Sequence, residues 1–153
     1  MKEKPRDQEI KKDMQPGRLI LDGFLGDDDR PLEVIINEDK QVLDDLDVTC
    51  QELAAAMDNL SHTGTEALGQ PAELDGYIVV TEEWMGWLGC PFKDGRRLAK
   101  RNSTVTHVAS GEEMTWSDLH IHLIGEHGFF QGKGSSHRLE PAALVRFLRL
   151  QQD

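Results

Sequence analysis

The sequence predicts an α+β fold: a small antiparallel sheet with about three helices packed on one side. Two observations lead to this prediction. Helix-capping signals occur near residues 49, 115 and 140, and β-prone runs bounded by turn residues lie between and before them. The 153 residues are enough for one hydrophobic core. We therefore expect a single domain over residues 18–153.

The first part of the chain is expected to hold a tail and two strands. Residues 1–17 are highly charged, lack periodicity and end in Pro-Gly, a pattern typical of a disordered N-terminal tail. The runs RLILDGFLG, residues 18–26, and PLEVIINE, residues 31–38, are rich in residues that favour strands. The acidic Gly-Asp segment between them predicts a turn.

The first helix has a clear start. Thr49 followed by Glu52 forms a capping box, in which each side chain satisfies a free amide of the first turn. Leu53 and Leu60 then lie on one stripe, which predicts a helix to about residue 61. Gly64 suits its exit because glycine adopts the left-handed conformation that ends many helices.

A hairpin and two further helices are expected in the second half. GYIVVTEEW, residues 76–84, is a typical strand, and the turn signal Lys93-Asp94-Gly95 joins residues 84–92 to residues 97–110. Thr115, with Asp118 three residues later, predicts a helix start, and Gly128 predicts its end. Proline at position 141 opens a last helix, which we expect to reach about residue 150.

Functional residues are expected between Trp84 and Arg138. All three tryptophans and five of the six histidines lie in this stretch. Tryptophan and phenylalanine there could form a stacking platform, but we interpret the following residues as core: Trp84, Trp87, Phe129 and Phe130.

Three histidines lie on the helix expected at residues 115–127. At about 100° per residue, His120 and His127 share the apolar face, where we interpret them as packed, hydrogen-bonded side chains. His122 faces the other way between Asp118 and Glu126, which indicates a solvated stripe of charges.

A metal site is the alternative interpretation of these histidines. A hairpin that carries Cys90, followed by a helix that carries His122 and His127, loosely resembles the ββα layout of a zinc finger. Two departures oppose it: a second cysteine near Cys90 is missing, and the distance along the chain to His122 is too long. His107 could complete a zinc site in some other fold. The prediction is therefore no cofactor, with zinc on these four residues as the alternative.

The residues around the predicted hairpin turn form a basic patch in an acidic chain. The net charge is −11, yet residues 93–101 carry the following cations: Lys93, Arg96, Arg97, Lys100 and Arg101. They could pair with the acidic first part or bind an acidic protein, a phosphate ligand or nucleic acid. Because residues 1–92 hold 8 basic against 21 acidic side chains, wrapping duplex nucleic acid over the whole surface is excluded.

A Gly-rich loop at residues 131–138 is the second candidate contact surface. Its GKGSSHR run resembles a phosphate loop but fails the P-loop spacing, because Gly134 follows Lys133 where serine or threonine is needed. Lys133 and Arg138 could still bind an anion with the backbone amides. A flexible connector is the simpler interpretation.

The leading functional hypothesis is a non-enzymatic binding or adaptor module that uses the basic 93–101 hairpin and the 131–138 loop. The rival class is a metal-dependent or Cys/His hydrolytic enzyme built from Cys90 and the histidines between 107 and 127. No apolar run is long enough to cross a bilayer, so no membrane partner is expected. Two widely separated cysteines favour a reducing cytoplasm.

Overall fold

A computed structural model describes residues 3–20 and 22–150. In this part of the chain, five helices accompany one antiparallel sheet of four strands, so the mixed α+β class is confirmed, whereas the expected number of about three helices is too low. The elements in chain order are α1 (Pro5–Asp13), α2 (Leu32–Asp45), α3 (Cys50–Glu66), β1 (Ala72–Leu74), β2 (Tyr77–Gly89), β3 (Arg97–His107), β4 (Glu113–Ser117), α4 (Asp118–His127) and α5 (Pro141–Leu148).

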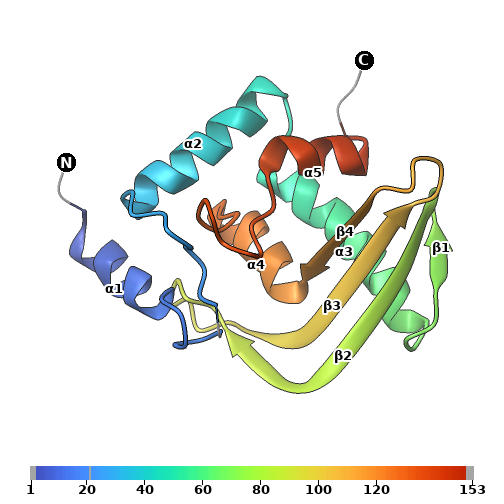
Figure 1. Cartoon of the computed structure of the whole chain (residues 1–153), viewed down its shortest axis with the longest axis horizontal. Helices are drawn as coiled ribbons and strands as arrows, with labels where there is room; N and C mark the ends of the chain where they lie inside the picture. The colour runs from blue at the N-terminus through green and yellow to red at the C-terminus, as the bar shows by residue number, and fades with distance from the viewer. Residues whose placement is uncertain (1–2, 21, 151–153) are drawn as a thin grey trace.

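The sheet has the order β1-β2-β3-β4, and β2 and β3 are much longer than their outer neighbours. Pairing of β1 with β2 stops at Val79, and pairing of β4 with β3 begins at Asn102. Beyond these points β2 and β3 continue as a two-stranded, strongly bent ribbon, visible at the bottom of Figure 1. We call residues 84–89 and 97–101 the distal ribbon.

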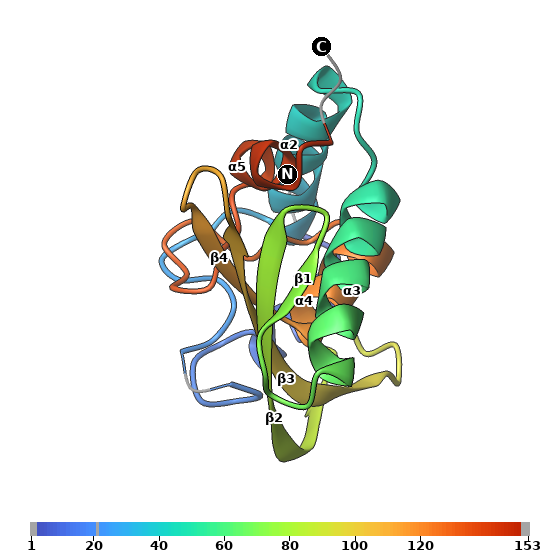
Figure 2. The same cartoon turned by 90° about the vertical axis from the view of Figure 1, so that its right-hand side faces the viewer.

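Helices α3 and α4 pack against each other and against the sheet (Figures 1 and 2). The sheet face toward them carries buried side chains such as Val79 and Val105, while Ile78 on the opposite face is exposed. Gly64 lies inside α3 and does not end it. A Cβ at this position would lie 2.2 Å from Thr81 Oγ1, so glycine permits the close approach of α3 to β2.

The two strands expected near the N-terminus are wrong where the structure describes them. Residues 32–45 form α2, whose buried residues recur at helical spacing, from Leu32 through Ile35 and Asp39 to Leu43. Strand propensity of the Val-Ile-Ile run is outweighed because this stripe is buried only in a helix. Residues 18–20 and 22–26 form turns and irregular backbone; Leu21 lies outside the described residues.

Residues 5–13, expected within a disordered tail at 1–17, form α1; residues 1–2 lie outside the described part. The charged sequence conceals two apolar side chains, Ile10 and Met14, which are both buried. Pro5 opens the helix, where its fixed φ and missing amide cost nothing. Two buried contacts are too few to detect by periodicity, yet they dock the helix.

The predicted helix starts are partly confirmed. The capping box of Thr49 and Glu52 is present in α3, and Pro141 opens α5. For α4, Thr115 is part of β4, and the N-cap is Ser117, whose partner is His120 at the third helical position. The predicted end of α4 is confirmed, with Gly128 in the left-handed conformation.

Two clusters of buried apolar side chains meet at α4. The larger one fills the space between the sheet, α3 and α5, and it contains Ile124 of α4. The smaller one contains Leu119 and Leu123 of α4 together with Ile10 and Phe92, from α1 and the β2–β3 turn. Helix α4 is thus held on both sides. None of the helices in the described ranges has the length and apolar character that a bilayer crossing needs.

Candidate functional site

The turn between β2 and β3, residues 90–96, is the predicted hairpin turn, and we call it the hairpin tip. The amide of Cys90 donates to the carbonyl of Arg96 at 3.0 Å, which closes the turn. Lys93 and Gly95 have φ values of 59° and 79°, so the chain turns sharply through left-handed conformations. The tip folds back onto α4 and lies beside α1 in Figure 1, where Lys93 forms an ion pair with Asp13.

Four side chains meet where the tip contacts α4, and we call them the polar cluster. They are Cys90, Asp94, His122 and His127, with one nitrogen, oxygen or sulfur atom from each lying within 4.8 Å of the others. Asp94 Oδ2 is 2.8 Å from Nε2 of both imidazoles. Cys90 Sγ is 3.6 Å from Nε2 of His127.

The orientation of the cluster is fixed by neighbouring groups. The other carboxylate oxygen of Asp94, Oδ1, accepts a hydrogen bond from the amide of Arg96 at 2.9 Å, so Oδ2 is left to point at the histidines. The ring of Phe92 stacks on that of His127, with centroids 4.2 Å apart and planes 5° from parallel. Backbone and aromatic contacts therefore set both side chains in place.

The two acidic groups of the cluster, Cys90 and Asp94, differ in their protonation at neutral pH. Desolvation raises the pKa of the Cys90 thiol to about 12, so the isolated cysteine stays protonated at neutral pH. Desolvation also raises the pKa of Asp94, but hydrogen bonds from the Arg96 amide and from His127 and His122 outweigh it and hold that pKa below its usual range. Asp94 is therefore a carboxylate, whereas Cys90 is not a free thiolate nucleophile.

His122 does not lie on a solvated stripe, which corrects the helical-wheel interpretation. Its residue is only 7% exposed because the hairpin tip covers this side of α4. Its expected neighbour Asp118 pairs instead with Arg101 at 2.8 Å. A wheel finds one apolar face, but here a polar loop packs on a second face, and no local pattern encodes that contact.

The other two candidate histidines have separate surroundings. His107 lies at the end of β3, where its Nδ1 is 2.8 Å from Ser110 Oγ and its ring packs against Tyr77. It is not part of the polar cluster. His120 is an architectural residue: its Nδ1 accepts from the amide of Ser117, and its Nε2 is 2.8 Å from the carbonyl oxygen of His137. Burial lowers the pKa of His120 to about 4.

Asp94 is the cluster member that sequence reasoning missed. The sequence indicates only a turn residue at this position, because Asp before Gly is a common turn signal. The signal that could have found it is its spacing of four from Cys90 within the same turn, since a turn brings side chains at this separation together.

The basic patch divides into paired and exposed cations. Lys93 pairs with Asp13 and Arg101 with Asp118, at 3.1 and 2.8 Å. The remaining cations of the patch are exposed, and no ion pair is found for them within the described residues; they are Arg96, Arg97 and Lys100.

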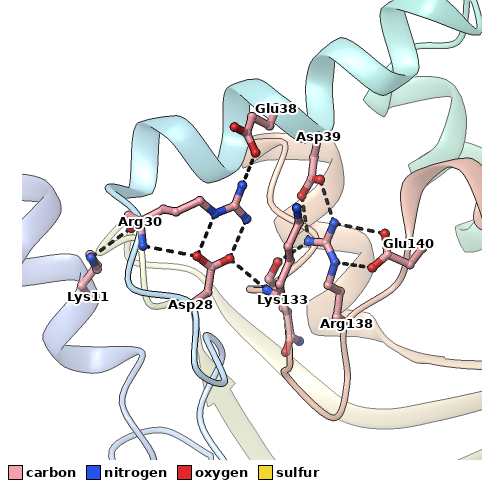
Figure 3. A network of polar contacts seen from close by, with 9 residues as sticks. Lys11, Asp28, Arg30, Glu38, Asp39, Lys133, Arg138 and Glu140 are labelled. Carbon is pink, nitrogen blue, oxygen red and sulfur yellow. Dashed lines mark hydrogen bonds and ion pairs between the residues drawn. The ribbon is translucent and has the colours of Figure 1, made fainter.

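The Gly-rich loop is built into the fold. Arg138, with its side chain only 5% exposed, donates to both carboxylate oxygens of Asp39 at 2.8 and 2.9 Å, and it also bonds Glu140 (Figure 3). The amide of Lys133 donates to Asp28, which binds Arg30. Arg138 is therefore not available to a ligand, while the Lys133 residue is exposed.

The distal ribbon carries large apolar side chains on the surface. The exposed fractions of Trp84, Met85 and Trp87 are 52%, 95% and 63%. Trp84 pairs across the ribbon with Lys100 and Trp87 with Ala99, and the two residues between the tryptophans form a bulge. The interpretation of both tryptophans as core is wrong, whereas Phe129 and Phe130 are buried as expected. The alternation of polar and apolar residues could not show that β2 and β3 extend beyond their outer neighbours β1 and β4.

Comparison with protein-family models, with curated proteins and with solved structures found no match for this chain. The functional interpretation therefore rests on two features of the structure itself. One is the polar cluster under the hairpin tip, and the other is the distal ribbon with its exposed tryptophans and cations.

Proposed function

We propose that the protein is a non-enzymatic binding module that contacts a partner protein through the distal ribbon. The observation that carries this proposal is the exposure of Trp84, Met85 and Trp87 within four consecutive positions. Burying aromatic surface on association is strongly favourable, and tryptophan is enriched among the residues that dominate interface energies. Three such side chains in water are unfavourable for an isolated protein and favour a role in contact.

The charges beside these side chains select the partner chemistry. Arg96, Arg97 and Lys100 project from the tip and β3, which gives the contact surface a local positive charge in a chain of net charge −11. An acidic face on the partner would pair with them, and complementary charge steers association. Single-stranded nucleic acid also uses aromatic and basic side chains. The acidic remainder of the chain repels a strand that carries a phosphate at every nucleotide, whereas an acidic face on a protein can be local, so an acidic protein is the better candidate.

The test compares two ribbon variants with a surface control. The variants are Trp84→Ala with Trp87→Ala, and Arg96→Ala with Arg97→Ala and Lys100→Ala; the control is Val108→Ala, an exposed valine that follows β3 at the end away from the ribbon. Each is immobilised, and proteins captured from extract of the source cells are compared by quantitative mass spectrometry at low and high salt. The same chains are titrated with a labelled single-stranded DNA.

We expect both ribbon variants to lose a set of acidic proteins that wild type and the Val108 control retain. The arginine–lysine variant should lose most of the captured protein at low salt, because the charge pairs that it removes are already screened at high salt. The melting temperature should barely change, since these side chains are exposed. Identical capture by all four chains contradicts the proposal. Ribbon-dependent binding of DNA would contradict the choice of partner.

A further inference from the structure

The polar cluster combines the ligand types and the convergence of a metal centre. We propose that Cys90, Asp94, His122 and His127 bind one zinc ion. The sulfur, the carboxylate oxygen and the two Nε2 atoms all point to one region, where they lie within 4.8 Å of one another. Four groups from two segments, the hairpin tip and α4, thus aim one atom each at a common point.

The pattern of contacts separates an ion site from a catalytic triad. In a Cys–His–Asp triad the two ring nitrogens of the histidine serve different partners, with the nucleophile on one and the carboxylate on the other. Here Cys90 Sγ and Asp94 Oδ2 both approach the same nitrogen of His127, Nε2. A second imidazole, that of His122, presents its own Nε2 to the same oxygen. The imidazole of His127 therefore does not bridge the thiol and the carboxylate as a triad histidine does, and the four donor atoms face one point.

The distances agree with a tetrahedral site after a small adjustment. Zinc bonds of about 2.0–2.1 Å to nitrogen or oxygen and about 2.3 Å to sulfur place neighbouring ligand atoms roughly 3.3–3.6 Å apart. The 3.6 Å between Cys90 Sγ and His127 Nε2 already lies in that range. The two 2.8 Å contacts of Asp94 are hydrogen-bond lengths and would open by about 0.5 Å around an ion. Separations of up to 4.8 Å within the cluster would close by about 1.2 Å.

The donor set selects zinc among the common cations. One thiol, two imidazoles and one carboxylate match its borderline-soft character, whereas calcium and magnesium require mostly oxygen ligands. Binding exchanges the Cys90 S–H bond for a sulfur–zinc bond, and the proton passes to solvent. Each imidazole, whose Nε2 donates a proton to the Asp94 carboxylate in the metal-free protein, loses that Nε2 proton on binding and carries its single proton on Nδ1. The thiolate and the carboxylate of Asp94 then balance the two positive charges of the ion.

Four protein ligands leave no open coordination position, which is typical of structural zinc sites and not of catalytic ones. The ion would tie the hairpin tip to α4 from the far end of the distal ribbon. The ribbon would then be fixed at both ends, at the sheet by its strand partners and at the tip by the metal. The Asp94 and His127 side chains remain 24% and 20% exposed, which leaves a route for the ion to enter.

The experiment uses the full chain without a polyhistidine tag. Protein is stripped of metal, dialysed against zinc and then against buffer, and its zinc content is measured by mass spectrometry. The variants are Cys90→Ser, Asp94→Asn, His122→Gln and His127→Gln. Matched controls of the same residue types are Cys50→Ser and His62→Gln, neither of which belongs to the cluster. Cobalt(II) replaces zinc in a parallel titration, because its absorption reports tetrahedral geometry and thiolate ligation.

We expect about one zinc per chain in wild type and in both controls, and an affinity at least about 100-fold weaker in the four variants. The thiolate-to-cobalt band should vanish in Cys90→Ser. A chelator should lower the melting temperature of wild type and controls but not that of Cys90→Ser. In the Cys50→Ser chain, zinc should protect the remaining thiol from iodoacetamide.

Two results would overturn the proposal. One is wild-type protein that retains neither zinc nor cobalt after dialysis. The other is zinc retention by Cys90→Ser and Asp94→Asn equal to wild type. These two variants are decisive because Asp94 lies on an exposed turn and serine replaces cysteine with little change in size, so both chains can be checked for folding by circular dichroism. Hydrolytic activity that needs Cys90 without metal would also contradict a structural ion.

Discussion

Arg138 shows how a single residue can resemble a ligand contact in sequence and serve the core in the structure. It follows a Gly-Ser loop and precedes a helix, where arginine often binds anions. Its anion is instead Asp39, a carboxylate of α2 that is 4% exposed. Hydrogen bonds to both carboxylate oxygens use the planar geometry of the guanidinium, which lysine could not reproduce.

Replacing Arg138 by methionine should therefore strongly destabilise the protein. The change leaves the buried Asp39 without its partner, and breaking a buried pair in this way costs about 3–5 kcal/mol. The free energy of unfolding is measured by urea titration. The double variant Arg138→Met with Asp39→Leu should recover much of the loss, because no unpaired charge is left. Arg146→Ala on the exposed side of α5 is the control; a loss of similar size there would contradict the assignment to the buried pair.

Asp94 is the corresponding case in the polar cluster. One carboxylate oxygen stabilises the turn through the Arg96 amide, and the other contacts His122 and His127. A single residue thus determines both the shape of the tip and its attachment to α4. The turn role is readable from the sequence, while the contact role depends on where α4 lies.

At the level of elements, α4 organises the molecule. Its N-terminus follows β4 directly, its two flanks enter the two apolar clusters, and it carries both imidazoles of the polar cluster, at positions 122 and 127. Ser117 forms the first contact of the helix: its hydroxyl accepts from the amide of His120 at 3.2 Å, and its own amide donates to His120 Nδ1. Histidine thus takes the place of the usual glutamate or glutamine in this capping box.

Ser117→Ala should destabilise the protein by about 1 kcal/mol, because the amide of His120 loses its acceptor. Ser117→Gly should cost only a few tenths of that, since glycine leaves the amides open to water. Both are measured by chemical denaturation. Thr49→Ala, the same change at the cap of α3, is the matched comparison and should cost a similar amount. Equal losses of stability from alanine and glycine at position 117 would contradict the capping role of the serine hydroxyl.

At the scale of the whole molecule, α1 is part of the smaller apolar cluster. Met14 is fully buried, and the carbonyl of the same residue accepts from the amide of Phe24. Phe24 in turn accepts from the amide of Gly132, so the N-terminal helix and the Gly-rich loop share one connecting segment. The ion pair of Lys93 with Asp13 joins the hairpin tip to the same helix. Charged sequence at the N-terminus is therefore integrated through few but buried contacts.

Met14→Ala tests whether α1 belongs to the fold. Removing a buried methionine side chain should cost about 2–5 kcal/mol, depending on how far the cavity collapses. Unfolding free energy and limited proteolysis are measured together, and cleavage near α1 should become faster. Gln8→Ala, on the exposed side of the same helix, should leave both unchanged. A Met14 variant as stable as wild type would show that this segment is a tail after all.

Much of the secondary structure could be predicted because its signals are local. The capping box at Thr49, the hairpin around residues 93–95 and the glycine end of α4 each depend on residues within a few positions. The apolar run of α2 has strand propensity, so the sequence does not predict this helix. The helical conformation is favoured because it buries one row of apolar side chains against α5 and α1. The alternative metal interpretation groups three of the four cluster residues, Cys90, His122 and His127, but has His107 in the place of Asp94.

The sequence by itself determined the α+β class, the capped helices, the hairpin and the charge that surrounds it, since each follows from backbone preferences and short-range periodicity. Only the tertiary structure decided which side of α4 the hairpin tip covers, that Arg138 is internal, and that Trp84 and Trp87 are exposed. The physical reason is the range of the interactions. The burial of a side chain and the assembly of the polar cluster depend on residues that are 28 to 99 positions away along the chain. No local sequence pattern carries that information.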